Sequence, residues 1–273
     1  MRRAAAFLVL CTALSPAFAD EMALRMRLAE QKSGVVVESR DDGERVVGEI
    51  YAFLPQPFES ASAALKDPAS WCEILMLHID NKECRVVRTA SGTVLQAGVV
   101  THYDQPASSA FRVEFAYRLA RETPQFVEAH LGAADGPLDT RDFDIVFEGV
   151  RTPDGRMFAH MSYAYAYGPI SRIALALYLA TFGHGKVGFT VLGQEPDGRP
   201  RYVSGMRGVV ERNTVRYYLA VEAWLGASGA VREERLDRAL RGWWAAIERY
   251  PRQLHEVDEE RYLGMKRVEL GLR

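Results

Sequence analysis

The sequence has few of the residues that build metal sites or nucleophilic active sites. Its six histidines are dispersed along the chain, and neither they nor the three cysteines form the closely spaced pairs that bind zinc. No Gly-x-Ser-x-Gly motif of a serine hydrolase occurs. Residues 183–186, Gly-His-Gly-Lys, resemble a phosphate-binding loop, but Val187 stands where a serine or threonine would bind magnesium. We therefore expect no metal and no cofactor.

The sequence also lacks a long hydrophobic run and an excess of positive charge. Its first apolar run, residues 4–14, is far shorter than the roughly 20 residues that span a bilayer. Only five of the 34 basic residues are lysine, and the formal net charge is −2. Such a chain has no general attraction for nucleic acid. We expect no membrane span and no nucleic-acid partner, and nothing in the sequence indicates an oligomeric state.

The N-terminus has the pattern of a cleaved export signal. Two arginines precede the apolar run, and Ala-Phe-Ala at residues 17–19 places small residues at the two positions that signal peptidase recognises. We predict that residues 1–19 are a signal peptide cleaved before Asp20, and that the mature protein is periplasmic or secreted. The alternative is a buried N-terminal helix. After cleavage of the signal peptide, residues 20–273 would form one domain. Its formal net charge would be −4, because two arginines are removed with the signal peptide.

Two cysteines, Cys72 and Cys84, remain in the predicted mature chain. In an oxidising compartment such a pair is usually a disulfide. The loop between them is short, so a bond would stabilise the fold by about 3 kcal/mol on the chain-entropy estimate. Two separate buried thiols, which behave as small hydrophobic groups, are the alternative.

Residues 48–77 are predicted to form a strand followed by two short helices. Two prolines should end the strand after residue 54, because proline cannot donate to a β-ladder. Apolar residues at i, i+3 and i+7 predict a helix over residues 58–66. Asp67 is placed to cap the second helix, with Pro68 in its first turn, where the missing N–H of proline costs nothing.

Runs of β-prone residues separated by turns rich in Gly, Pro and Asp predict an antiparallel sheet. The connections are too short for the crossovers that parallel strands need. The expected strands are residues 35–38, 45–54, 84–89, 93–103, 110–121, 125–131, 143–152, 156–167, 186–192, 201–212 and 215–225, with a helix as the alternative for the last.

Further helices are predicted in the second half of the chain, over residues 170–182 and 231–250, with a shorter one over residues 258–270. Residues 170–182 carry one charge, Arg172, and are apolar on nearly all sides. Such a helix is most often buried, although it can also line an apolar cavity or contact a membrane surface. Residues 231–250 show one apolar stripe, with acidic residues in the first turn and a basic residue in the last, as the helix dipole favours.

A short motif and the order of these elements carry a resemblance to a known family. The motif residues are Pro57-Phe58-Glu59, Leu65, Asp67-Pro68 and Trp71, and the apolar stripe at residues 236–247 closes the pattern. The chain resembles the START-related, polyketide-cyclase-like helix-grip superfamily. The resemblance implies an α+β fold in which a curved antiparallel sheet wraps around a long C-terminal helix, with residues 170–182 as an added helix. It also implies a cavity for a lipid, sterol, polyketide or similar apolar ligand.

Four candidate ligand residues would line this cavity. Tyr163 and Tyr165 share one strand face and, if that face points inward, would supply flat walls with polar tips. An outward aromatic stripe is the alternative. Trp243 and Ile247 would line the cavity from the C-terminal helix.

A cluster of charged residues could bind the polar head of a ligand. If residues 207–216 form a strand, Arg207 and Glu211 lie on one face and Arg212 and Arg216 on the other. Either set could bind a ligand carboxylate. A ladder of cross-strand ion pairs on a solvated face is the alternative. We assign Arg207 and Glu211 to the ligand.

The sequence therefore favours an exported protein that binds or carries a hydrophobic or amphipathic small molecule, without evident catalysis. One alternative is a hydrolase or cyclase-like enzyme on the same scaffold, with Glu211 or His160 as acid or base. Another is an envelope interaction protein that docks a partner through residues 170–182.

Overall fold

The computed structural model describes residues 16–31, 34–180, 185–227 and 231–272, which fall into two compact units divided between residues 32 and 33. The first unit contains helix α1 (Pro16–Glu30), which includes the predicted cleavage site. The arginines and the apolar run of the predicted signal lie outside the described residues, so the signal peptide stays a prediction. None of the helices within the described ranges combines the length and the apolar character needed to cross a membrane.

The second unit contains one large sheet, one small sheet and seven α-helices among its described residues. In chain order its elements are β1 (Val35–Asp41), β2 (Arg45–Pro57), α2 (Phe58–Leu65), α3 (Pro68–Leu77), β3 (Asn81–Thr89), β4 (Gly92–Val99), η1 (Ala107–Ser109), β5 (Phe111–Thr123), β6 (Phe126–Asp135), η2 (Pro137–Asp139), β7 (Thr140–Arg151), β8 (Arg156–Tyr167), α4 (Pro169–Ala180), β9 (Val191–Gln194), β10 (Pro200–Tyr202), α5 (Gly205–Gly226), α6 (Arg232–Ile247), α7 (Pro251–Leu254) and α8 (Glu259–Leu270).

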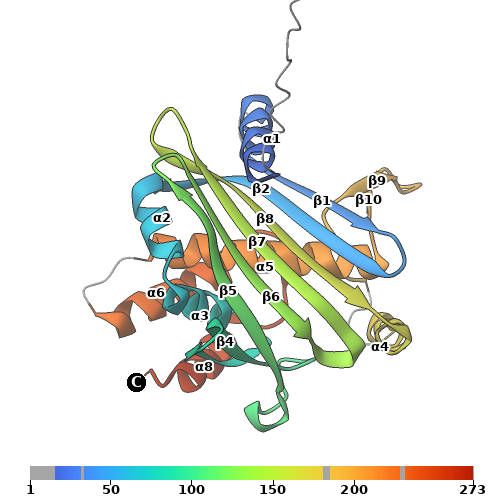
Figure 1. Ribbon diagram of the computed structural model, residues 1–273. Helices are drawn as coiled ribbons and strands as arrows, with labels where there is room; N and C mark the ends of the chain where they lie inside the picture. The colour runs from blue at the N-terminus through green and yellow to red at the C-terminus, as the bar shows by residue number, and fades with distance from the viewer. Residues whose placement is uncertain (1–15, 32–33, 181–184, 228–230, 273) are drawn as a thin grey trace, which may run out of the picture. The chain divides into compact units, whose positions relative to one another are not determined.

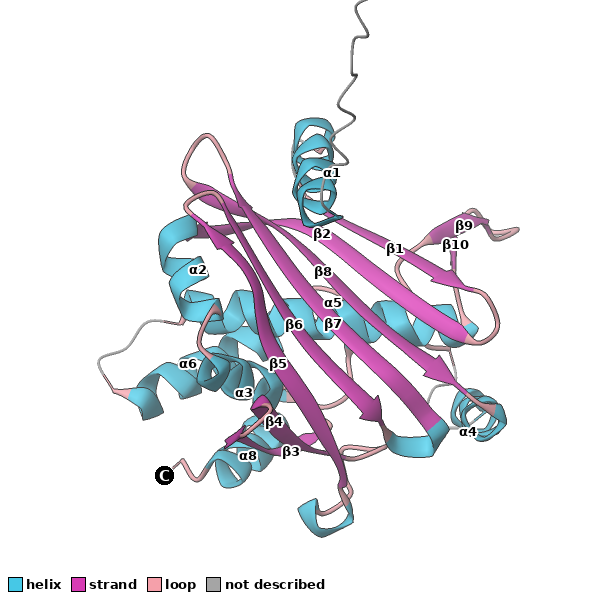
Figure 2. Ribbon diagram, in the orientation of Figure 1, coloured by secondary structure: helices cyan, strands magenta, loops and turns pink. Residues whose placement is uncertain are grey.

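The large sheet is a curved antiparallel sheet with the strand order β1-β2-β8-β7-β6-β5-β4-β3 (Figure 2). From β3 to β8 it is a meander in which each strand pairs with the next. The pair α2–α3 carries the chain from β2 to β3 at the far edge, and the meander returns to pair β8 with β2. The predicted α+β class with a large antiparallel sheet is confirmed.

The helix pair forms as its sequence predicts. Asp67 caps α3, because its carboxylate accepts a hydrogen bond from the backbone N–H of Ala69 at 2.9 Å. The indole of Trp71 donates to the carbonyl of Leu65 at 2.7 Å and so joins α3 to the end of α2. The preceding strand runs on to Pro57, beyond the predicted end, because the pairing of β2 with β8 shifts register after Leu54 and accommodates both prolines.

The predicted disulfide is confirmed. Cys72 on α3 is bonded to Cys84 on β3, with the two Cα atoms 5.3 Å apart. The bond joins the helix pair to the edge of the sheet at which the meander begins.

The longest described helix of the second unit is α5. The strand predicted over residues 201–212 was therefore wrong over most of its length, and over residues 215–225 the strand was wrong and its alternative, a helix, is confirmed. Of the β-structure predicted over residues 186–212, the described residues contain the short hairpin of β9 and β10. Helix α5 packs against β1, β2 and β8 and also against α6 (Figure 1). Its valines and tyrosines have high β propensity, and burial on opposite sides removes the polar face that would mark a helix.

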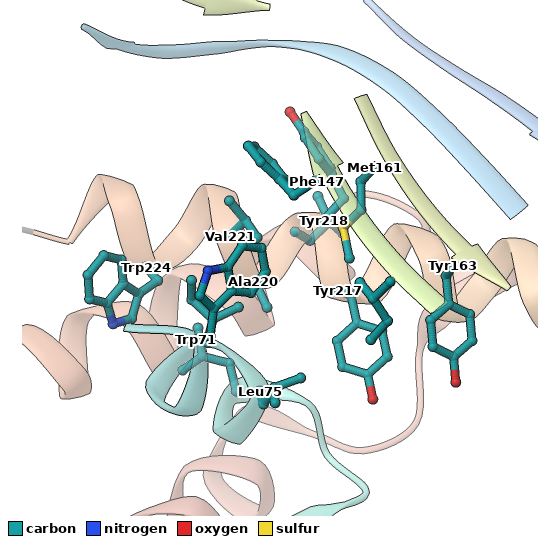
Figure 3. Packing of buried hydrophobic residues seen from close by; sticks show 14 of the residues in the cluster. Trp71, Leu75, Phe147, Met161, Tyr163, Tyr217, Tyr218, Ala220, Val221 and Trp224 are labelled. Carbon is teal, nitrogen blue, oxygen red and sulfur yellow. The ribbon is translucent and has the colours of Figure 1, made fainter. Parts of the chain in front are cut away.

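Helix α6 has the predicted apolar stripe, with Leu236, Leu240, Trp243 and Ile247 buried. It packs mainly against α5 and α8. The helix that lies against the sheet is therefore α5, which corrects the role predicted for residues 231–250. Figure 3 shows the core between these layers, where Trp71 of α3 lies close to the side chains of α5.

Candidate functional site

A cavity of about 280 Å³ lies between the sheet and α5 within the second unit. Strands β5, β7 and β8 supply one wall, α4 and α5 supply others, and the loop after β4 contributes as well. The two tyrosines predicted from strand alternation are both part of the wall.

Aromatic rings form the apolar part of this cavity. Tyr163 packs against Tyr165 with ring centroids 5.7 Å apart, and Phe143 stacks on Tyr165 at 5.3 Å. Tyr217 of α5 lies 5.5 Å from Tyr163, and Figure 3 shows the two hydroxyl groups pointing the same way. The tyrosine face of β8 is therefore inward. Burial raises the pKa of both Tyr163 and Tyr165, so that each remains a neutral hydroxyl group at physiological pH.

Charged side chains form the polar part of the cavity lining. Arg212 and Arg216 lie one turn apart on α5, and both are almost fully buried. Nη2 of Arg216 forms an ion pair of 2.5 Å with Oε1 of Glu256, which also pairs with Lys186. Burial alone would raise the pKa of Glu256, but Arg216 and Lys186 outweigh it and lower the pKa. Glu256 therefore stays ionised.

His78 and Asp80 approach the same cavity from the loop between α3 and β3. The backbone N–H of Asp80 donates to Nδ1 of His78 at 3.2 Å, which places the proton of a neutral imidazole on Nε2. Burial, with Arg216 and Lys266 nearby, holds the pKa of His78 well below its usual value. Burial also raises the pKa of Asp80 to about 6. The cavity thus contains a neutral histidine beside a carboxyl group that titrates near neutrality.

Glu211 lies in the core, outside the cavity wall. Its carboxylate accepts hydrogen bonds from Ser39 Oγ, from the backbone N–H groups of Phe189 and Thr190, and from Thr190 Oγ1, at 2.5 to 2.9 Å. Arg207 donates from Nε to the same Ser39 hydroxyl at 2.9 Å. Both residues therefore join α5 to β1, and Glu211 also joins α5 to the segment before β9. The predicted role of this pair at a ligand head group needs correction, because a helix, unlike a strand, turns this face away from the cavity.

Trp243 and Ile247 also lie outside the cavity wall, in the core. The indole of Trp243 donates to the carbonyl of Arg216 at 3.0 Å and stacks on Tyr262 with centroids 5.0 Å apart. Since α5 lies between α6 and the sheet, these residues pack against the side of α5 that faces away from the sheet. Trp243 thereby positions the backbone of a cavity residue without touching the cavity.

Three charged or titratable residues of the cavity lining were not selected by sequence analysis: His78, Asp80 and Glu256. They come from a loop and from the segment after α7, and they have no shared spacing. Arg212 and Arg216 were recognised as a pair, because residues four apart share a face both on a strand and on a helix. No local sequence pattern links His78, Asp80 and Glu256 to Arg212 and Arg216.

Helix α4 contradicts the expectation that it is buried. Ile170, Ile173 and Leu177 are 59%, 63% and 63% exposed. On the other side, Ala174 and Tyr178 line the cavity. Because the helix is apolar on both sides, its sequence could not show which side meets solvent.

His160, the second predicted acid or base, lies on the face of β8 opposite to Tyr163. Its Nδ1 is 2.7 Å from Oε2 of Glu148, and its Nε2 forms an ion pair of 3.5 Å with Oε1 of Glu49. It therefore cannot act inside the cavity. In the parts of the chain that the structure describes, no group of three or more His, Cys, Asp or Glu residues is arranged to hold a metal ion.

Comparison with known proteins finds similarity among solved structures. No protein-family model matches this sequence, and no curated protein matches it. Among solved structures, the chain is similar to human StAR-related lipid transfer protein 5, with 10% sequence identity over 61% of this chain and 90% of that chain, and a TM-score of 0.32. At that identity and TM-score the likeness carries no argument about the ligand of this chain.

Proposed function

We propose that this chain is an exported START-like protein that binds an amphipathic small molecule in the cavity between the sheet and α5. The observation that carries the proposal is a cavity lined by both aromatic and charged side chains, since an amphipathic ligand matches both. The disulfide between Cys72 and Cys84 supports export, because such bonds persist in oxidising compartments.

The volume of the cavity bounds its ligand. At about 280 Å³ it is near the lower end of the roughly 300–1,000 Å³ typical of ligand pockets. This volume suits a single acyl chain or a compact ring system better than a lipid with two long chains.

Native mass spectrometry of protein purified without detergent, combined with titration of fluorescent fatty-acid and sterol probes, tests this proposal. A variant that fills the cavity, Ala174→Trp, should abolish probe binding, because Ala174 lines it. Ala176→Trp is the matched control on the same helix, at an exposed position. Loss of binding in both variants, or no ligand and no probe binding in the wild type, would contradict the proposal.

A second candidate function is hydrolysis or cyclisation, which the carboxyl group of Asp80 favours. A general acid or base works best when its pKa lies near the working pH, and Asp80 titrates at about 6 beside the neutral His78. Turnover of a panel of chromogenic short-chain esters by the wild type, lost in Asp80→Asn with binding retained, would support this function. Equal rates in both proteins would contradict it.

A third candidate function, contact with a lipid bilayer, is favoured by α4. Its exposed side presents Ile170, Ile173 and Leu177, while its other side lines the cavity, so a ligand could pass from a bilayer along this helix. Flotation with phospholipid vesicles should recover the wild type and leave the Ile173→Asp/Leu177→Asp variant in solution. Flotation of neither protein would count against this role.

A further inference from the structure

Arg212 is a buried cation that lacks a buried anion among the described residues. Its side chain lies on the cavity wall and the residue is 2% exposed. Its contacts are long, with Nη1 3.5 Å from the carbonyl oxygen of Val187 and Nη2 3.5 Å from the hydroxyl of Tyr178. Within the described ranges, no carboxylate lies within 4.0 Å of this guanidinium, and its Nε has no hydrogen-bond partner.

Other buried cations of this protein are matched. Arg216 pairs with Glu256, and Lys266 pairs with Glu269 at 2.6 Å while it also donates to the carbonyl of Asn81. A buried charge without an ion pair is unfavourable, because long hydrogen bonds offset little of the cost of desolvation. Arg212 is the exception, and it lies on the cavity wall.

Two more donors at the cavity lack partners in the described chain. They are Nε of Arg216 and Nε2 of His78, both fully shielded from solvent. The tautomer of His78 leaves the proton on Nε2, since Nδ1 accepts from Asp80. Together with Nε of Arg212, three donors on cavity-lining residues are unpaired within the described ranges, so this part of the cavity lining has an excess of hydrogen-bond donors.

We propose that the ligand of this cavity carries a carboxylate head group that binds Arg212, with Arg216 and His78 nearby and its apolar part against Tyr163 and Tyr165. A guanidinium matches a carboxylate by two parallel hydrogen bonds, and its charge persists at any physiological pH. This inference rests on the proposed binding function and specifies the class of ligand.

Three probes with one chain length test the head group: dodecanoate, dodecanol and dodecyl phosphate, measured by displacement of a fluorescent probe. The wild type should bind dodecanoate about 10- to 100-fold more tightly than dodecanol, as a charged hydrogen-bonded pair implies. Equal binding of the two would overturn the proposal. Tighter binding of dodecyl phosphate would overturn the choice of carboxylate. Binding of none of the three would overturn the binding function itself.

Arg212→Met should reduce the preference for dodecanoate to less than about threefold and leave the affinity for dodecanol unchanged. The control is Arg207→Gln, on the same helix but away from the cavity, which should retain the preference. Because the substitution leaves no described carboxylate unpaired, Arg212→Met should unfold at the same temperature as the wild type or higher. A folded Arg212→Met protein that retains the preference would refute the assignment.

Discussion

Gly48 of β2 and Thr214 of α5 are in such close contact that a methyl group at position 48 would overlap Oγ1 of Thr214. The same methyl group would lie 3.2 Å from the carbonyl oxygen of Val210. The absence of a side chain at Gly48 therefore sets how closely α5 approaches the sheet.

Gly48→Ala should destabilise the fold by about 1–3 kcal/mol, because overpacking forces α5 away from β2. Urea denaturation measures the change. Thr214→Ala should lower the additional cost of Gly48→Ala, since it removes the closest clashing atom, and a double-mutant cycle gives the coupling. Additive effects of the two substitutions would show that the contact does not limit the approach of α5.

Glu256→Gln should destabilise the protein by about 1–3 kcal/mol, because it leaves both Arg216 and Lys186 without their shared carboxylate. The side chain of Glu256 is 23% exposed, so the loss should be smaller than for a fully buried pair. Glu248→Gln is the control, since Glu248 pairs with the exposed His255. It should change the free energy of unfolding by less than about 0.5 kcal/mol. Similar values for the two variants would contradict a special role for the ion pair at the cavity.

Loss of the disulfide should destabilise the protein by about 3 kcal/mol, because the bond closes a short loop and restricts the unfolded chain. The double variant Cys72→Ala/Cys84→Ala, compared with the oxidised wild type by denaturant unfolding, measures this. A thiol count on unfolded, unreduced mature protein provides the control. Two reactive thiols would show that the bond does not form in solution.

The free energy of unfolding should fall at alkaline pH, because His160 loses its proton there. Burial alone would lower the pKa of His160, but Glu148 and Glu49 outweigh it and raise the pKa to about 9. Because the folded-state pKa exceeds the unfolded value, this stabilisation is fully present below about pH 6.5 and is lost as pH rises through about 9. The loss should be on the order of 3 kcal/mol.

His160→Gln should flatten this part of the pH profile, measured by thermal unfolding between pH 6 and pH 10. His255→Gln, at an exposed position, should retain the slope of the wild type. An unchanged slope in His160→Gln would show that the proton on His160 does not drive the effect.

Local sequence signals predicted the parts of the fold whose determinants are close together in the chain. The carboxylate of Asp67 caps α3 through a backbone N–H two residues away, and the alternation of Tyr163 and Tyr165 needs only one strand. The pairing of Cys72 with Cys84 spans 12 residues. The same reasoning misread α5, because burial between the sheet and α6 gives its residues no polar face that would distinguish a helix from a strand.

The candidate site was only partly predictable, for a related reason. Tyr163 and Tyr165 were predicted from the two-residue alternation of a strand. Arg212 and Arg216 were predicted from a spacing of four residues, which places side chains on one face of either a strand or a helix. His78, Asp80 and Glu256 reach the cavity from segments with no common pattern. Nothing in residues 170–182 could show that one side of α4 faces the cavity and the other faces solvent, because both sides are apolar.

By itself, the sequence determined the α+β class, the meander, the helix pair and the disulfide, because each depends on residues near one another in the chain. Only the tertiary structure decided that α5 is the helix against the sheet and that Glu211 is a structural anchor. It also decided that Arg212, at the cavity, has no carboxylate partner among the residues that the structure describes. These properties depend on which distant side chains become neighbours, and that follows from the packing of the whole unit.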